Sequence, residues 1–476
     1  MLFSSIEFIL FFFPVVYAVY CILPLKAKNY WLMLASLFFY AWGEPRFVLV
    51  MMGSICANFF LALGIEKTRE RRLSPKLLMA ADIAVNLGIL MVFKYMNFMT
   101  HTLRAWLPMT RRFVPATSIA LPIGISFFTF QALSYVIDVY RGLPAQRNIA
   151  YLALYISLFP QLIAGPIVRY NTIADQIYAR KVGFDDLSEG MLRFMTGFSK
   201  KILLANTLAE VADAAFALHS RSVLMAWTGA VCYALQIYFD FSGYSDMAIG
   251  LGRMFGFHFL ENFDYPYLSQ TVTEFWRRWH ISLGTWFRDY VYYPLGGSRV
   301  GSRRRLVFNL LVVWLLTGVW HGANWTFILW GLLYGCAIIF EKLTGIPKAI
   351  RNWPAPARAG YRLLTLLAIT LGWVLFRADH LKDAWWYFRG MLGIAGNAVS
   401  GDDFIFYGRE YLAYIAAGLL CATPVFNGIK RRLIAANGAL AGAVECASDV
   451  VRLALFVISF TMLVISAHNP FIYFNF

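Results

Sequence analysis

Long apolar runs, separated by short basic or turn-forming segments, occupy most of this 476-residue chain. Several runs approach the roughly 20 residues that an α-helix needs to cross the hydrocarbon core of a bilayer. The pattern predicts an all-α polytopic membrane protein with about eleven transmembrane helices. Interfacial helices, for example in the amphipathic segment 171–190, and re-entrant helices are expected around a central cavity. No long polar stretch marks off a second domain, so residues 1–476 are predicted to form one membrane-embedded domain.

The composition agrees with a membrane protein. The chain is 60% hydrophobic and 14% charged, whereas soluble proteins carry about 25% charged residues. Its net charge of +16 is typical of some nucleic-acid-binding proteins, but the basic residues gather in short loops, as cytoplasmic loops do. We therefore expect contacts with membrane lipid and no nucleic-acid partner. The basic loop 66–76 is predicted to be cytoplasmic, which places the N-terminus outside.

The most informative stretch runs from Thr271 to Phe340. It begins with the Thr-x-x-Glu spacing of a capping box, formed by Thr271 and Glu274. Apolar and aromatic residues then recur at helical spacing as far as Tyr290. The pattern predicts one helix at the membrane interface, with His280 on its apolar face.

The second part of this stretch, 306–340, contains no Asp, Glu, Lys or Arg. As one straight helix it would be about 50 Å long, which exceeds a hydrocarbon core of about 30 Å. We predict a break at its polar island, His321 to Asn324, which follows Gly318. Asn324 either donates a hydrogen bond to an oxyanion or caps the helix that begins at Trp325, and we favour the cap.

Six sequence motifs are similar to those of the membrane-bound O-acyltransferase family, and within it to the branch of bacterial alginate O-acetyltransferases. They are WRRWHISLGTWFRDYVYYPLGG from Trp276, WHGANWTFILWGLLYG from Trp320, LPIGISFFTFQALSYVIDVYRG from Leu121, FPQLIAGPIVRY from Phe159, YFDFSGYSDMAIG from Tyr238, and the terminal NPFIYFNF. The resemblance extends over essentially the whole chain. It implies the fold of that family, with His280 and His321 at the two histidine positions of the family.

The resemblance also implies a function and its partners. The expected reaction is O-acyl transfer of an acetyl group from cytoplasmic acetyl-CoA, across the bacterial inner membrane, to a polysaccharide such as alginate. Extracytoplasmic, hydrolase-like partner proteins are expected to complete the transfer. Two alternatives stay open: O-acylation of peptidoglycan or another cell-wall polymer, including D-alanylation, and a transporter or flippase. The chain shows no internal repeat, which disfavours a transporter.

His321 is the first candidate for catalysis. A histidine can take a proton near neutral pH, which is what activation of a hydroxyl for attack on an acyl carbonyl requires. His321 acts as such a base, carries the acetyl group briefly, or merely satisfies backbone groups at a helix break. His280 orients the substrate, shapes the surroundings of His321, or is an interfacial histidine. No third ligand accompanies the two histidines at regular spacing, so we expect no metal.

Two acidic residues, Asp240 and Asp246, lie in another apolar run. Two kinds of role stay open: they line a tunnel or bind a proton, or they cap a broken helix or pair with one of the arginines. The six cysteines are scattered and are predicted to be packing residues.

Overall fold

The computed structural model describes residues 1–69, 74–218, 220–436, 438–465 and 471–472, and these residues form helices and no strands. The all-α prediction is therefore confirmed for the described part of the chain. Within it, five helices are long and apolar enough to cross a membrane, and a sixth is added if the bent pair 412–436 counts as one span. The count of about eleven spans stays a prediction. Residues 70–73 of the basic loop and most of the terminal NPFIYFNF motif lie outside the described residues.

The chain divides into two compact units. The first contains residues 1–191 and 248–260, and the second contains residues 192–247 and 261–476. Two helices, α10 (Phe184–Ser199) and α12 (Val223–Met254), belong partly to each unit. The single domain expected over residues 1–476 stays a prediction.

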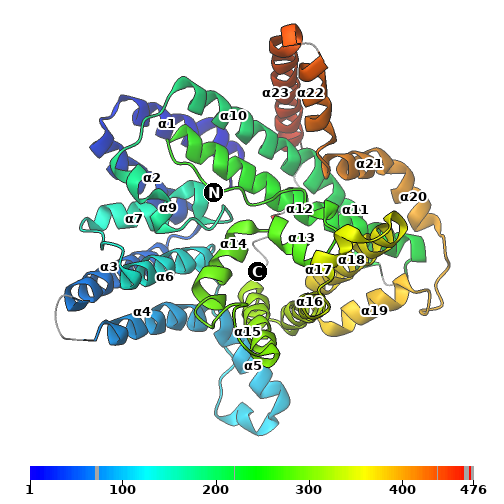
Figure 1. The fold of residues 1–476 in the computed structure, drawn as a ribbon, viewed down its shortest axis with the longest axis horizontal. Coiled ribbons are helices and arrows are strands. Elements are labelled where there is room, and N and C mark those ends of the chain that lie inside the picture. Colours follow the sequence, from blue (N-terminus) through cyan, green and yellow to red (C-terminus); the bar gives the residue numbers. More distant parts are fainter. Residues whose placement is uncertain (70–73, 219, 437, 466–470, 473–476) are drawn as a thin grey trace. The chain divides into compact units, whose positions relative to one another are not determined.

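The first unit contains the N-terminal helices (Figure 1). They are α1 (Phe13–Ile22), α2 (Leu25–Gly43), α3 (Val48–Arg69), α4 (Pro75–Leu90), α5 (Met96–Trp106), α6 (Ile125–Arg141), α7 (Ile149–Ser157), α8 (Phe159–Leu162) and α9 (Tyr170–Tyr178). Helices α3, α4 and α6 pack on one another. Asn86 on α4 donates to Asn58 on α3 at 3.0 Å, so these buried polar groups satisfy each other.

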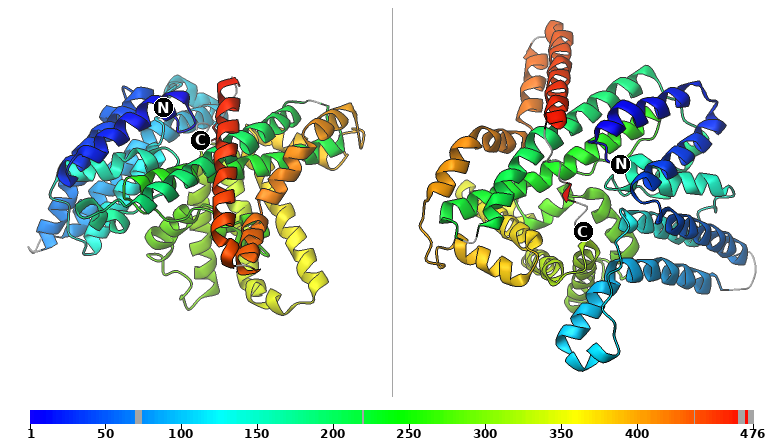
Figure 2. Two further views of the ribbon diagram at one scale, coloured as in Figure 1. Left: turned by 90° about the horizontal axis from the view of Figure 1, so that it is seen from above. Right: turned by 180° about the vertical axis from the view of Figure 1, so that it is seen from behind.

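The second unit contains both candidate histidines. Its helices are α11 (Thr207–Ala217), α13 (Val272–Arg278), α14 (Ile281–Phe287), α15 (Arg303–His321), α16 (Trp325–Thr344), α17 (Ile346–Ala349), α18 (Ala355–Arg377), α19 (Leu381–Met391), α20 (Asp402–Glu410), α21 (Leu412–Cys421), α22 (Val425–Ala436) and α23 (Ala441–Ile465), with parts of α10 and α12. A π-helical stretch, η4 (Lys200–Asn206), joins α10 to α11. Figure 2 shows α23 in red beside α22 in orange.

Helices α15 and α16 pack as an antiparallel hairpin. Glycine makes the close crossing possible, because a Cβ atom at Gly318 would lie 2.5 Å from the carbonyl oxygen of Phe327 and 3.3 Å from the Cα of Gly331. Helix α15 ends at His321 and α16 begins at Trp325. The predicted break in the apolar run 306–340 is therefore confirmed.

The prediction of one helix from 271 to 290 is wrong. Helix α13 ends at Arg278, His280 adopts a left-handed conformation with φ 46° and ψ 54°, and α14 begins at Ile281. Two backbone hydrogen bonds from a distant segment support the break. The N–H of Asp264 donates to the carbonyl of Arg278, and the N–H of Ile281 donates to the carbonyl of Asn262, each at 3.0 Å. His280 therefore does not lie on the apolar face of α13.

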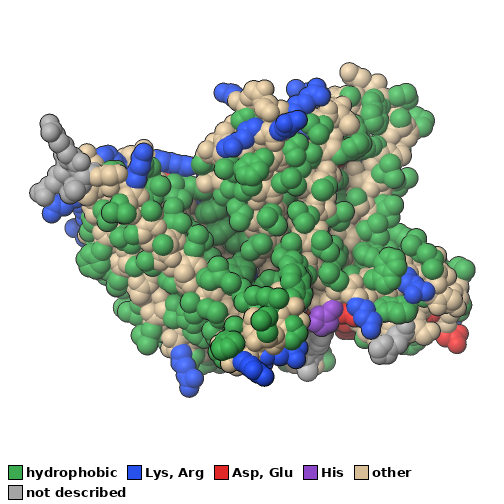
Figure 3. Space-filling model, turned by 90° about the horizontal axis from the view of Figure 1, so that it is seen from below, with side chains coloured by type: hydrophobic (Ala, Val, Ile, Leu, Met, Phe, Trp, Pro, Cys, Tyr) green, Lys and Arg blue, Asp and Glu red, His purple; other side chains and the backbone are tan. Residues whose placement is uncertain are grey.

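Apolar side chains are also abundant on the outside. On the face shown in Figure 3, hydrophobic side chains cover much of the surface, and lysine and arginine side chains gather near its edges. Among the exposed residues are Phe11, Leu49, Phe60 and Leu363, each at least 65% accessible. A soluble protein rarely leaves so much apolar area in water, whereas lipid tails solvate it well.

Candidate functional site

The N-terminus of α13 is held by two side chains. The Oγ1 atom of Thr271 accepts a hydrogen bond from the N–H of Glu274 at 3.1 Å, as the capping spacing predicts. The buried carboxylate of Glu341, on α16, accepts from the N–H groups of Val272 at 2.7 Å and Thr273 at 2.8 Å. A negative charge is favourable at a helix N-terminus, so Glu341 fixes α13 against α16.

Aromatic side chains hold the other side of α13. The ring of Trp276 lies 5.0 Å from that of Trp314 and 5.3 Å from that of Trp330. The ring of Trp279 lies 4.8 Å from that of Trp373 on α18. The face of α13 is thus packed into the core of the second unit, and the residue that follows Trp279 has a fixed position.

His280 is only 2% exposed. Its ring lies edge-on to Phe241 at 4.6 Å and 6.0 Å from Trp320, measured between ring centroids. Burial in these apolar surroundings lowers the pKa of His280 to about 3, so the imidazole is neutral near pH 7. Nδ1 lies 3.2 Å from Oδ1 of Asn262, and Nε2 has no hydrogen-bond partner among the described residues.

His321 is the last residue of α15 and is also buried. Its ring lies 4.9 Å from Trp320, 4.8 Å from Trp330 and 5.3 Å from Phe376. Because Trp320 contacts both imidazoles, their centroids are no further apart than the sum of its two distances, 6.0 Å and 4.9 Å, which is about 11 Å. Two histidines that are distant in the sequence are therefore neighbours within the second unit.

Asn324 caps α16, as favoured from the sequence. Its Oδ1 accepts from the N–H of Thr326 at 3.3 Å, and its Nδ2 donates to the carbonyl of Asp379 at 2.6 Å. The turn after His321 is thereby tied both to α16 and to the end of α18.

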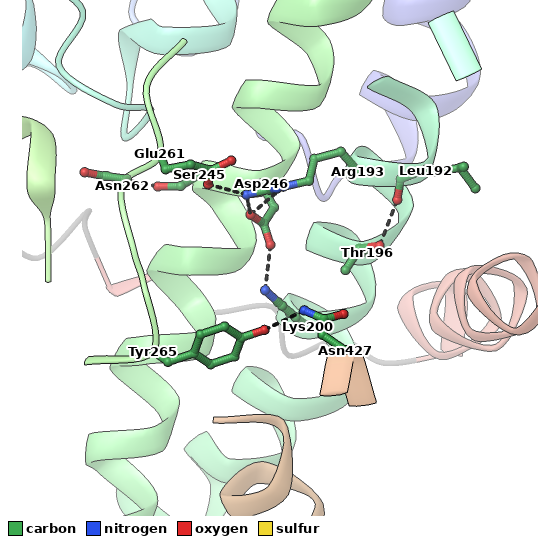
Figure 4. A network of polar contacts seen from close by, with 10 residues as sticks. All are labelled: Leu192, Arg193, Thr196, Lys200, Ser245, Asp246, Glu261, Asn262, Tyr265 and Asn427. Atoms are coloured by element: carbon green, nitrogen blue, oxygen red, sulfur yellow. Dashed lines mark hydrogen bonds and ion pairs between the residues drawn. The ribbon is translucent and has the colours of Figure 1, made fainter. Parts of the chain in front are cut away.

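Asp240 forms a buried ion pair with Lys201. Its carboxylate lies 2.5 Å from Nζ of Lys201, with side chains that are 3% and 1% exposed, and it accepts from the N–H of Ile472 at 2.9 Å. Asp246 contacts Arg193 at 2.6 Å and Lys200 at 2.7 Å (Figure 4). Asp246 thus pairs with an arginine, as one alternative proposed, whereas the partner of Asp240 is a lysine.

Asn262 was missed by the sequence reasoning. It lies in the segment after α12, and its side chain contacts Nδ1 of His280. In the sequence, Asn262 stands out only as an uncharged polar residue close to the apolar Leu260 and Phe263. That pattern does not identify His280, 18 positions further on, as its partner.

A cavity of about 840 Å³ opens near the His321 turn. Its lining includes Arg377 and Asp379 at the end of α18, together with Arg221 and residues of α19. Neither histidine is among its lining residues, but Phe376, the neighbour of Arg377, packs on the ring of His321.

In the described part of the chain, no group of three His, Cys, Asp or Glu side chains could hold a metal ion. The expectation that no metal is needed stays a prediction.

Comparison with known proteins matches residues 77–346 to the membrane-bound O-acyltransferase family. The chain is 39% identical to a probable alginate O-acetylase AlgI of Pseudomonas putida, over the whole length of both chains. It is 45% identical to a probable alginate O-acetylase AlgI of Azotobacter vinelandii, over 82% of this chain and 78% of the relative. It is 33% identical to a peptidoglycan O-acetyltransferase of Helicobacter pylori, over 100% of this chain and 98% of the relative.

The Asp240 ion pair yields a stability prediction. Asp240→Asn leaves the buried charge of Lys201 without its counter-charge, so we expect a loss of about 3–5 kcal/mol in unfolding free energy. The measurement is thermal or denaturant unfolding of the purified protein in detergent. As a control, Asp449→Asn removes a more exposed pair with Arg452 and should change stability by less than about 1 kcal/mol. An Asp240→Asn variant of unchanged stability that has lost acetyl transfer would instead assign Asp240 to the reaction.

Proposed function

The chain belongs to the membrane-bound O-acyltransferase family and is an O-acyltransferase, and on this premise we propose a specific reaction. The enzyme takes an acetyl group from cytoplasmic acetyl-CoA and delivers it across the membrane. The group is used for O-acetylation of an extracytoplasmic polysaccharide such as alginate. The protein itself lies in the inner membrane of a bacterium. The observation that carries this proposal is the pair of buried histidines that both lie next to Trp320, in a chain similar over its length to alginate O-acetylases.

The two histidines have distinct places in this reaction. In the base mechanism, His321 takes the proton of an acceptor hydroxyl while the oxygen of that hydroxyl attacks the thioester carbonyl of acetyl-CoA. The carbon–sulfur bond then breaks, and the thiolate that leaves takes up the proton. In the alternative mechanism, a nitrogen of His321 holds the acetyl group between donor and acceptor. His280 serves either mechanism through Nε2, the nitrogen that has no hydrogen-bond partner among the described residues.

The orientation of the second unit supports delivery across the membrane. Helices α15, α16 and α18 carry most of their basic residues at one end, namely Arg303, Arg304, Arg305, Lys342, Arg358 and Arg362, whereas Arg377 lies at the other end of α18. His321 lies at the other end of α15, about 28 Å away for a 19-residue helix. Since basic ends are favoured in the cytoplasm, this distribution supports the proposal that the His321 turn faces the outside.

The cavity near this turn supports an approach of the acceptor from the outside. Its volume of about 840 Å³ falls within the range of roughly 300–1,000 Å³ that is common for small-molecule sites. Polar lining residues such as Arg221 and Asp379 suit a polar acceptor group.

A second candidate function has support from a specific relative. Similarity to a peptidoglycan O-acetyltransferase extends over the whole chain, so peptidoglycan is the next acceptor to test. Acceptor identity is decided by supplying alginate and peptidoglycan fragments to the same membranes and measuring acetyl ester on each.

Replacement of the histidines tests the catalytic proposal. We expect His321→Ala and His280→Ala each to lower acetyl transfer at least about 100-fold, because a general acid–base group contributes roughly 10²–10⁴-fold. The measurement is polymer-bound acetyl ester in cells, with membrane content of the variant determined in parallel. His101→Ala, in α5 of the first unit, is a matched control that should keep full activity. Substantial product from a well-inserted His321→Ala variant would exclude its catalytic role.

The enzyme is further predicted to need extracytoplasmic partner proteins. The connections between the described helices are short, and units below about 40 residues seldom fold without disulfides or metals. The chain therefore offers little to bind a long polymer, and a hydrolase-like acetyltransferase outside should accept the group. Liposomes that contain this chain alone, with acetyl-CoA inside and soluble polymer outside, should leave the polymer unmodified. Acetylation at the rate of complete membranes would contradict the need for a partner.

The membrane orientation is open to a direct test. With the N-terminus outside and the loop 66–76 in the cytoplasm, a cysteine introduced at Lys76 should resist a membrane-impermeant thiol reagent in intact cells. The same cysteine should react after the cells are permeabilised. All six natural cysteines are first replaced by serine or alanine, in a variant that retains activity. Reaction in intact cells would reverse the proposed orientation.

A further inference from the structure

The hydrogen bonds around Asn262 determine which way its amide group is turned. Oδ1 accepts from the backbone N–H of Ser282 at 3.2 Å, and a backbone N–H can only donate. Oδ1 also accepts from the hydroxyl of Ser282 at 2.9 Å. On the other side, Nδ2 donates to Oγ of Ser245 on α12 at 3.1 Å. The amide oxygen therefore faces His280, and the reverse orientation would place an NH₂ group against the backbone N–H.

The orientation of this amide sets the protonation of His280. Nδ1 of the imidazole lies 3.2 Å from Oδ1 of Asn262, and an amide oxygen can only accept. Nδ1 must therefore carry the hydrogen. In a neutral imidazole, a hydrogen on Nδ1 leaves the lone pair on Nε2. The hydroxyl of Ser282, 3.4 Å from Nδ1, already donates to Asn262, so it does not alter this assignment.

Asn262 is itself held firmly. Its neighbour Glu261 contacts Arg193 at 2.6 Å, and Arg193 contacts Asp246 on α12 at 2.6 Å (Figure 4). Its backbone carbonyl accepts from the N–H of Ile281, which is the residue after the strained His280. Asn262 is 1% exposed, so water does not compete for its amide. The same segment thus fixes both the backbone and the ring of His280.

We propose that Asn262 is a positioning residue for the acyl transfer, because it holds His280 in the tautomer that carries hydrogen on Nδ1 and a lone pair on Nε2. This inference rests on the proposed function, in which His280 contributes to catalysis. Nε2 is then ready to accept a proton or a hydrogen bond from a substrate group. Without an acceptor at Nδ1, the hydrogen could move to Nε2 and block that role.

Two substitutions separate this role from a merely structural one. Asn262→Leu removes the acceptor and should lower acetyl transfer about 10–100-fold, the effect known for loss of the hydrogen-bond partner of a metal-ligating histidine. Asn262→Asp keeps an acceptor oxygen in the same place and should restore most of the activity. Asn427→Leu is the matched control, since Asn427 bonds to Tyr265 of the same segment and is exposed, and it should stay near wild type.

A spectroscopic measurement reads the tautomer directly. In protein labelled with ¹⁵N-histidine, the signals of His280 are identified among the seven histidines by their loss in His280→Gln. We expect hydrogen on Nδ1 and none on Nε2 in the wild type, and a shift of hydrogen toward Nε2 in Asn262→Leu. Hydrogen on Nε2 in the wild type would overturn the inference, whatever the variants do.

The outcomes distinguish this inference from the proposed function. If His280→Ala retains acetyl transfer, the catalytic place of His280 in the proposed function fails, and Asn262 has no reaction to support. If His280→Ala is inactive while Asn262→Leu keeps full activity and an unchanged tautomer, the proposed function stands and the positioning role is overturned.

Discussion

The left-handed backbone at His280 is the constraint on which the candidate site depends. A non-glycine residue in this conformation costs on the order of 1–3 kcal/mol and persists only where its surroundings enforce it. Here the enforcement comes from both sides: Trp279 is packed into an aromatic core, and Ile281 donates its N–H to the 262–264 segment. The break turns the imidazole off the face of α13 and toward Trp320, where the second histidine also lies.

Buried charges hold the elements around this break. The buried carboxylate of Glu341 accepts hydrogen bonds from the N-terminus of α13, and the buried carboxylate of Asp246 pairs with Arg193. Arg193 is partly exposed and also contacts the exposed Glu261, the neighbour of Asn262. The Asp240–Lys201 pair ties α12 to η4. Such pairs add little net stability, because removing the charges from water costs as much as their attraction returns. Their contribution is geometric. An unpaired buried carboxylate costs free energy, so the arrangement in which every carboxylate has its partner is favoured over the others.

The parts of this arrangement that depend on neighbouring residues could be predicted from the sequence. The break at His321 follows from local facts: an apolar run too long for one straight helix, with a single polar island inside it. The cap at Asn324 is equally local. The break at His280 is not, because the helical spacing of apolar residues continues through it and the hydrogen bonds that support it come from Asn262 and Asp264. The roles of Asp240 and Asp246 stayed open for the same reason, since their cations lie about 40–50 positions earlier in the chain.

The surroundings of His280 also limit the chemistry that it can perform. An imidazole that carries an acetyl group on Nε2 and keeps its hydrogen on Nδ1 is a cation, and burial disfavours an isolated cation. The charge could be relieved only if Nδ1 gave its proton to a base, and the amide oxygen of Asn262 is not one. A proton or a hydrogen bond received at Nε2 avoids a lasting charge, because the oxyanion formed in the same step lies beside it and the proton then moves on to the leaving group. The neutral amide partner therefore favours His280 as an acceptor over His280 as a covalent carrier.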